Sequence, residues 1–461
     1  MNFVKTIKFI ALTATLSACQ SNYNGAIDQQ VEFPTRWQNA LPETPQGTKL
    51  VQWVGSEQLN QLIETAIANN QNIRIKQLDV DKAKLNLQRA GAVFWPDLDF
   101  SLQASRGKSA SDAAISNQVS AGLSASYEID LWGKLSDAQK AAQYNYQNTI
   151  VQLEQAQLDL ITSVSSVWLQ MLASVQFIDI TEQKLKNLQG NLDIIENGYR
   201  AGLNSALDVY LTRNNLEAEK SNLAKQKATL AQQSRQLSLL LGHSPKQGLE
   251  VGDDFPEVDF SLLKGIPSSL IKQRPDVQSA WLNILMSNAN LAISHKDRFP
   301  SFRLAADVDD RQSSLSDLFS QGIAWSLSAS VLQPIFDAGR LKTLEAQAEI
   351  ELSQSELSYV QTIYQALDDI EGGLNQFASL ERQLSYSETS RDNAILAEQL
   401  AFEQYQRGIT DYTDYLSTQR TAFNAKNQVV ELKRQIITNQ IMLHQALGGD
   451  FAIANLEQQE N

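Results

Sequence analysis

The sequence contains the same series of landmarks twice, 206 residues apart (408 − 202). The segment around Gly202 (Tyr199–Tyr210) returns around Gly408 (Tyr405–Leu416). The same offset carries Ile129–Leu135 onto Ile335–Leu341, and Leu241-Gly242 onto Leu447-Gly448. Three landmarks in one register indicate an internal duplication, so the fold must be built from two copies of one unit.

Each repeated segment is predicted to be the turn of a helical hairpin. Gly202 and Gly408 suit the left-handed backbone position just past a helix end. In the first turn, Ser205 and Asp208 have the spacing of a capping box. In the second turn, Asp411 is predicted to cap the next helix, and Asp414 to stabilise its first turn as Asp208 does in the first copy.

Very long helices are predicted on both sides of each turn. Apolar residues recur at threes and fours from Lys134 to about Asn197, and a return helix follows from Ser205 to Leu241. The second copy repeats this from Gly339 to Phe402, softened at Gly372-Gly373, with a return helix ending at Leu447. None of the ten prolines lies between Pro96 and Pro245 or after Pro334, which favours unbroken helices. Roughly 65 residues at 1.5 Å each give a helix of about 100 Å.

Four segments change to a period of two, which is typical of strands with one apolar and one polar face. A helix is predicted from Leu59 to about Ala90, and Trp95-Pro96 ends it. Two alternating runs follow, separated by a polar loop of about a dozen residues, and a helix from about Asp276 to His295 precedes two more. The apolar positions of the four runs begin and end at Leu98 and Ala104, Val119 and Leu131, Phe302 and Val308, and Ile323 and Val331.

These strands could form hairpins packed on a soluble core, but their length and flanks favour a membrane barrel. Each is near the ten or so residues that a tilted transmembrane strand needs. Four strands cannot close a barrel, and a bilayer does not tolerate open sheet edges, so the chain must oligomerise. A dimer and a trimer both satisfy that argument. The aromatic residues at one end of the strands form a predicted interfacial girdle: Trp95, Trp132, Phe299 and Phe336.

The N-terminus has the pattern of a bacterial secretion signal. Lys5 and Lys8 precede a short apolar run that ends in Leu16-Ser17-Ala18-Cys19. This ending resembles a lipobox, in which Cys19 is lipidated, although an ordinary signal with a chance cysteine is the alternative. Gln20 and Ser21 lack the Asp that retains enterobacterial lipoproteins in the inner membrane, so an outer-membrane address is predicted.

Composition excludes several other classes of function. The net charge of −14 argues against a nucleic-acid partner, which would need a basic face. There is no HExxH, GxSxG or Walker motif, so no enzyme activity, metal or cofactor is expected. The predicted domains are a signal peptide (1–18), a lipidated arm (19–58), a first repeat (59–245), an equatorial linker (246–272), a second repeat (273–449) and a tail (450–461).

With these features in place, the chain resembles the TolC-like outer-membrane efflux and secretion ducts, and more narrowly their NodT-type lipoprotein branch. The most specific segments are Gln273–Val277, Arg298–Phe302 and Pro334–Leu341, followed by the two tips. The family pattern usually has Arg at 273 and Glu at 281. Gln273 and Trp281 stand there instead, which alters a local ion pair and leaves the fold assignment intact.

The resemblance implies a trimer whose twelve strands form one barrel, continuous with a periplasmic tunnel of helices. It implies a periplasmic adaptor and an inner-membrane pump as partners, and export of small toxic compounds. A ring of acidic side chains at the tips, Asp411 and Asp414 and to a lesser extent Asp208, would narrow the entrance. The alternatives are a type I protein-secretion duct and, in a different class, a periplasmic coiled-coil adaptor or scaffold. The tip residues expected to contact the adaptor are Gly202, Gly408, Arg407, Tyr199 and Tyr405.

Overall fold

The computed structural model describes residues 54, 56–108, 115–245, 248–252, 254–256, 268–320 and 322–449. The predicted signal, Cys19 and the predicted tail lie outside the described residues. The chain divides into two compact units. Among the described residues, one unit spans 78–151 and 278–362, and the other spans 54–77, 152–277 and 363–449.

The first unit carries a four-stranded antiparallel sheet in the order β1-β2-β3-β4. Its strands are β1 (Asp97–Lys108), β2 (Ile115–Ile129), β3 (Ser301–Gln312) and β4 (Ala324–Leu332). The first two strands are longer than predicted. Their polar ends continue to pair as far as Lys108 and Ile115, so the predicted loop of a dozen residues is too long. Backbone pairing does not require apolar side chains, and it therefore extends past the apolar pattern.

The two middle strands of the sheet come from the two halves of the chain. Val119 of β2 lies opposite Gln312 of β3, and Ile129 lies opposite Phe302. Because side chains alternate along a strand, this register aligns apolar with apolar residues from Phe302 to Val308, and the apolar face becomes polar at Asp310 and Gln312. Neighbouring rows are Phe100, Leu123, Val308 and Trp325 on the apolar face, and Asp99, Ser124, Asp307 and Ser326 on the polar face.

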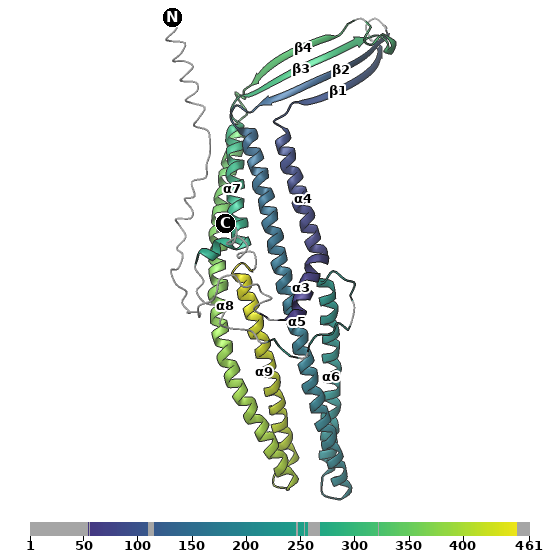
Figure 1. The fold of residues 1–461 in the computed structure, drawn as a ribbon, viewed down its shortest axis with the longest axis vertical. Helices are drawn as coiled ribbons and strands as arrows, with labels where there is room; N and C mark the ends of the chain where they lie inside the picture. The colour runs from purple at the N-terminus through teal and green to yellow at the C-terminus, as the bar shows by residue number, and fades with distance from the viewer. Residues whose placement is uncertain are drawn as a thin grey trace. The chain divides into compact units, whose positions relative to one another are not determined.

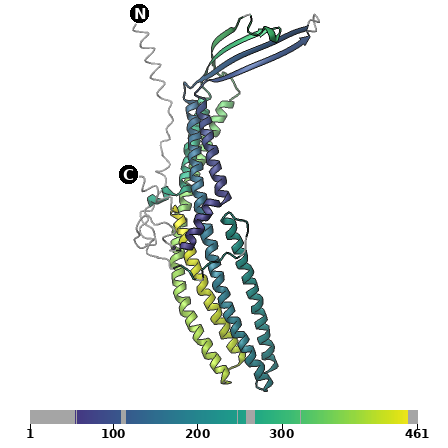
Figure 2. The same ribbon diagram turned by 45° about the vertical axis from the view of Figure 1, so that its right-hand side comes forward.

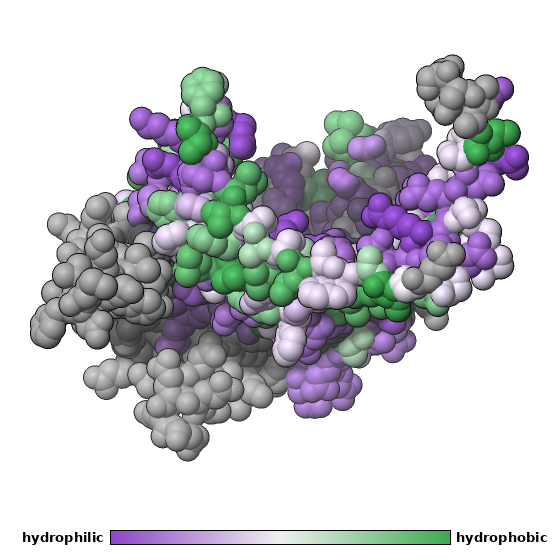
Figure 3. Space-filling model, turned by 90° about the horizontal axis from the view of Figure 1, so that it is seen from above, coloured by the Kyte–Doolittle hydropathy of each residue, from purple (hydrophilic) through white to green (hydrophobic). Residues whose placement is uncertain are grey.

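The apolar face of the sheet is left open within one protomer. Leu98, Phe100, Trp325 and Leu327 are all more than half exposed. In Figure 3, a view from above, green apolar and purple hydrophilic side chains lie beside one another. Among the described strands, β1 and β4 each have one edge that pairs with nothing. The described sheet of a single chain therefore has two unpaired strand edges and an uncovered apolar face.

In the second unit, two helical hairpins run beside each other (Figures 1 and 2). One consists of the later part of α5 (Lys134–Arg200) and α6 (Ala206–Leu240), and the other of the later part of α8 (Arg340–Gln406) and α9 (Tyr412–Ala446). α5 and α8 have 67 residues each, α6 and α9 have 35 each, and each second-copy helix begins 206 residues after its counterpart (340 − 134 and 412 − 206). One 18-residue window of α5 is apolar enough to cross a membrane, but 67% of it is buried, as in a core helix.

The predicted helix from Leu59 is two helices, α3 (Glu57–Asn69) and α4 (Gln71–Ala92). Asn70 interrupts them with an extended backbone. Its Oδ1 accepts hydrogen bonds from the N–H groups of Asn72 (2.9 Å) and Ile73 (3.3 Å), and its Nδ2 donates to the carbonyl of Leu240 (2.9 Å). Asn70 thus caps the start of α4 and is hydrogen-bonded to the end of α6. These bonds stabilise a break between α3 and α4 that the spacing of apolar residues does not reveal.

α8 runs through Gly372-Gly373 without a break, and the softening expected there stays a prediction. A Cβ added to Gly373 would lie 2.5 Å from Cδ2 of Leu443 on α9. Gly373 therefore permits close packing of α8 against α9. α7 (Pro275–Lys296) agrees with the predicted helix to within one residue at each end.

Candidate functional site

The two hairpin tips have the same backbone construction. Gly202 (φ 75°) and Gly408 (φ 69°) both adopt the left-handed conformation. In each tip an N–H bonds to a carbonyl five residues earlier: Leu203 to Gly198 (2.8 Å) and Ile409 to Gln404 (2.9 Å). This is the Schellman pattern that ends a helix on a glycine. The predicted hairpin turns, each with its glycine just past the end of a helix, are confirmed.

Asp208 in the first tip is occupied by the capping box that the sequence predicts. The N–H of Asp208 donates to Oγ of Ser205 (3.2 Å). The Asp208 carboxylate accepts from the N–H (3.0 Å) and the hydroxyl (2.8 Å) of Ser205. Its negative charge is thus held against the start of α6.

The second tip differs, and the predicted capping by the Asp411 side chain is wrong. Asp411 is the N-cap residue of α9 by backbone position, but its side chain makes no capping hydrogen bond. Asp414 instead accepts from the hydroxyl of Thr410 (3.1 Å). Two ionised carboxylates cannot donate to each other as Ser205 donates to Asp208, and they repel at this spacing. Asp411 and Asp414 are both exposed, so two acidic groups face solvent at this tip.

A cluster of tyrosines lies directly behind these acids. Tyr412 and Tyr415 are each 3% exposed, and they pack with Ile195 and Val209 of the first hairpin. The ring of Tyr405 lies 5.4 Å from that of Tyr412 and stacks at 6.2 Å on that of Tyr415. Burial raises the pKa of Tyr412 to about 12. The two buried tyrosines therefore pack between helices within the protomer.

Hydrogen bonds to tyrosine hydroxyls join the two hairpins. Asn204, in the first tip, donates to the hydroxyl of Tyr405 in the second (2.9 Å). Asn191 of α5 donates to the hydroxyl of Tyr415 (3.1 Å), which also accepts from Gln419 (2.7 Å). Local sequence spacing does not predict this network, which we call the tip latch. The recurrence of tyrosine at 405, 412 and 415 was the available signal.

The remaining predicted tip residues face outward. Tyr199 is half exposed, and Arg407 is exposed with Nη2 4.0 Å from Oε2 of Glu403. The apolar residues that follow the two glycines, Leu203 and Ile409, are 83% and 68% exposed. Each tip therefore presents an apolar side chain to its surroundings.

Two of the four predicted girdle aromatics form a cluster at one end of the sheet. Trp132 donates its indole N–H to the carbonyl of Pro300 (2.7 Å), and its ring lies 5.3 Å from that of Phe299. Trp95 precedes β1 and Phe336 follows β4, and both are largely exposed. The register Asp97 to Ser126 and Ser301 to Leu332 brings all four aromatics to the same end of the strands.

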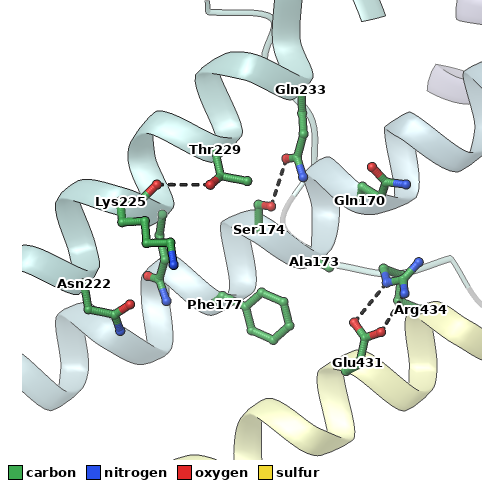
Figure 4. A pocket seen from close by; sticks show the side chains of 11 residues that line it. Gln170, Ala173, Ser174, Phe177, Asn222, Lys225, Thr229, Gln233, Glu431 and Arg434 are labelled. Carbon is green, nitrogen blue, oxygen red and sulfur yellow. Dashed lines mark hydrogen bonds and ion pairs between the residues drawn. The ribbon is translucent and has the colours of Figure 1, made fainter. Parts of the chain in front are cut away.

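A cavity of about 470 Å³ opens between α5, α6 and α9 (Figure 4). Ser174 donates to Gln233 (2.9 Å) across it, and Arg434 makes two bonds to Glu431 (2.6 and 3.0 Å). The hydrogen bond from Arg434 lowers the pKa of Glu431. Within the described ranges, no group of three His, Cys, Asp or Glu side chains is placed to hold a metal ion.

Comparison with known proteins gives consistent results over most of the chain. The family model for outer membrane efflux proteins matches residues 62–243 and 266–449. The pyoverdine export outer membrane protein OpmQ of Pseudomonas aeruginosa is 28% identical over 468 residues, which cover 97% of each chain. The cation efflux system protein CusC of Escherichia coli O6:H1 is 31% identical over 86% of each chain. A crystal structure of CusC superposes with a TM-score of 0.81 at 27% identity, covering 91% of this chain and 99% of that one.

Proposed function

This chain belongs to the outer membrane efflux protein family and is an outer-membrane efflux channel, and we propose that three copies form the exit duct of a tripartite pump for small toxic compounds. The sheet carries the proposal. Its four strands leave the edges of β1 and β4 open, and one of its faces is apolar. Pairing β1 of one copy with β4 of the next in a ring of three gives twelve strands, lipid-facing outside and polar inside.

The internal duplication supports the same assembly. The helices of the two repeats within one chain have equal lengths and are separated by a constant offset in sequence. A trimer of the chain therefore contains six nearly equivalent hairpins. We propose that they close into a periplasmic tunnel below the barrel. Native mass spectrometry of the purified protein tests the number of copies. A trimer is expected, and a dimer, with eight strands, would contradict the proposal.

We propose that Asp411 and Asp414 form an acidic collar at the tunnel entrance. Both are exposed, and neither is used in a capping box. Asp208 contributes less, because its carboxylate is bound to Ser205. Three copies would place six carboxylates of the second tip around one axis, where they would attract cations.

Replacing Asp411 and Asp414 together with Asn is expected to weaken block of single-channel current by hexamminecobalt(III) at least tenfold and to reduce cation selectivity. Asp392→Asn is the matched control, since it removes an exposed carboxylate from α8 about 20 Å before that helix ends. Unchanged block in the double variant, at normal assembly, would place the constriction elsewhere.

The tips are the proposed docking site of a periplasmic adaptor that links the duct to an inner-membrane pump. Leu203 and Ile409 at their ends, together with Tyr199 and Arg407, are exposed in a way that suits an apolar contact bordered by charge. The names of the relatives cover pyoverdine, cations and solvents. Cargo therefore varies widely among proteins similar to this one, which suits a passive duct whose cargo the pump selects.

Cys19 is the proposed lipid anchor. Cys19→Ala is expected to leave unprocessed precursor and to reduce incorporation of radiolabelled palmitate to background. Trimer assembly should survive, because strand pairing rather than the lipid holds the barrel in the membrane. Labelling that persists in the variant would show that the lipid is attached elsewhere.

A further inference from the structure

The connection between β3 and β4 folds back onto the sheet and is held there by a buried carboxylate. The N–H of Phe319 donates to Oδ2 of Asp310 (2.6 Å), and the amide of Gln312 donates to Oδ1 (2.7 Å). Asp310 is 4% exposed. A carboxylate can be buried at this position because both of its oxygens accept hydrogen bonds.

Asp310 lies on the apolar face of the sheet. Side chains alternate along β3, so Asp310 shares its face with Ala306 and Val308, and it lies opposite Ala121, which is also buried. The segment that bonds to Asp310 therefore lies over the outer side of the proposed barrel. The segment is bonded to β3, one of the two middle strands, and not to an edge strand that would pair with a neighbouring copy.

The depth of this segment corresponds to the far boundary of a bilayer. Eight residues separate Phe302, beside the Trp132–Phe299 cluster, from Asp310. At 3.4 Å per residue and a tilt of about 40°, they cover about 21 Å along the membrane normal, against an apolar band about 25 Å tall. The side chains of this face also become polar here, with Gln312 next on β3 and with Arg106 and Lys108 on β1.

At this boundary the segment presents two exposed apolar side chains. Phe319 is 66% exposed and has a left-handed backbone (φ 68°), a conformation that a bulky residue rarely adopts. Leu315, in the short helical turn η4 (Leu315–Asp317), is 67% exposed. The bond to Asp310 therefore holds the backbone of a residue whose aromatic ring is about two-thirds exposed.

We propose that this segment is a lipid anchor at the outer rim of the barrel. Asp310 holds Phe319 so that its ring, with Leu315, enters the hydrocarbon edge of the outer leaflet, while Arg106 and Lys108 face the anionic headgroups. The strands would then have aromatic anchors at both membrane boundaries. This anchor rests on the proposed barrel, whose apolar face must meet lipid.

Spin labels on single cysteines in the full-length protein test this anchor. The labelled variants are Phe319→Cys, with Leu123→Cys as the lipid-facing control and Ser124→Cys as the lumen-facing control. After reconstitution in vesicles of phosphatidylcholine and phosphatidylglycerol, collision rates are measured with oxygen, which is lipid-soluble, and with a water-soluble nickel chelate. The label at 319 is expected to favour oxygen as the label at 123 does, and Asp310→Ala is expected to shift it to the nickel-accessible value of 124. Asp310→Asn, which keeps the acceptor for the Phe319 N–H, should leave it unchanged.

The possible results distinguish a failure of the proposed anchor from a failure of the proposed barrel. A water-accessible label at 319, with a lipid-exposed label at 123, would overturn the anchor and leave the barrel standing. A label at 319 that neither reagent reaches would show that Phe319 packs against protein, which also overturns the anchor. A water-accessible label at 123 would refute the barrel itself.

Discussion

Arg274→Met is expected to lower the free energy of unfolding by about 3 kcal/mol, the lower end of the range for removing one partner of a buried ion pair. The Arg274 guanidinium is almost fully buried and makes four hydrogen bonds within the second unit. Nη1 donates to the carbonyl of Ala446 (2.8 Å), and Nη2 donates to Asp369 (3.0 Å). Nε and Nη2 donate to the two oxygens of Asp276 (3.1 and 2.9 Å).

The charge of Arg274 is therefore retained despite burial. Burial works to lower its pKa, but the hydrogen bonds and negative charges of Asp276 and Asp369 outweigh it, so the pKa is raised. The carboxylates of Asp276 and Asp369 are partly exposed, so water can solvate them when the arginine is removed. This solvation offsets part of the lost stability. The carbonyl of Ala446, at the end of α9, would lose its bond from this side chain.

Thermal and urea unfolding followed by circular dichroism measures the effect. Arg274→Lys should lose roughly half as much stability, because one ammonium keeps the charge but cannot reproduce the planar fork. Arg391→Met is the control, since the partner of Arg391 among the described residues is the adjacent, exposed Asp392, and its loss should cost under about 1 kcal/mol. Equal losses of stability in the Arg274→Met and Arg391→Met variants would show that the hydrogen bonds of Arg274 do not stabilise the fold.

The second large effect is expected in the strands. Leu123→Arg places a charge on the apolar face of β2, between Phe100 and Val308, and should cost about 2–4 kcal/mol near the bilayer midplane. Ser124→Arg introduces the same charge on the adjacent polar face, opposite Asp99 and Asp307, and should be tolerated. Comparing these two variants therefore tests which face of the strand meets lipid, because the introduced side chain is the same in both.

Urea titration of the protein in lipid vesicles gives the two stabilities. Leu327→Arg and Ser328→Arg repeat the comparison in β4, where Leu327 lies opposite Ala306 on the apolar face. A loss at Leu123 and Leu327 with little change at their neighbours is the expected pattern. Equal losses on the two faces would mean that the strands do not cross the membrane.

Periodicity predicted most of the secondary structure, because the long helices and the strands each carry apolar residues at a regular spacing. The proline-free runs and the duplicated glycines located both hairpins to within a few residues. The strand ends were missed because the polar residues near Lys108 and Ile115 still pair through their backbones. The break at Asn70 was missed because it depends on a bond to Leu240, which is 170 residues away.

The candidate site was predicted less completely than the fold. Local spacing was enough for the capping box at Ser205 and Asp208. The tip latch could not be read in this way, since Asn204 and Tyr405 are 201 residues apart and only the paired hairpins bring them together. Gln273 and Trp281 were expected to alter a local ion pair. Trp281 packs its ring 5.6 Å from that of Tyr359, and Arg274 forms the ion pairs of this motif with Asp276 and Asp369.

Single-channel current through the purified protein in planar bilayers tests the central claim, that this chain forms an outer-membrane duct, most directly. The wild type is expected to give discrete, long-lived conductance steps that favour cations. Asn191→Ala with Asn204→Ala, which removes the hydrogen bonds between the two hairpins, should give larger steps because the tips are held together less tightly. Protein that is inserted in the bilayer, in wild-type and latch-free forms alike, but conducts no ions would contradict the account.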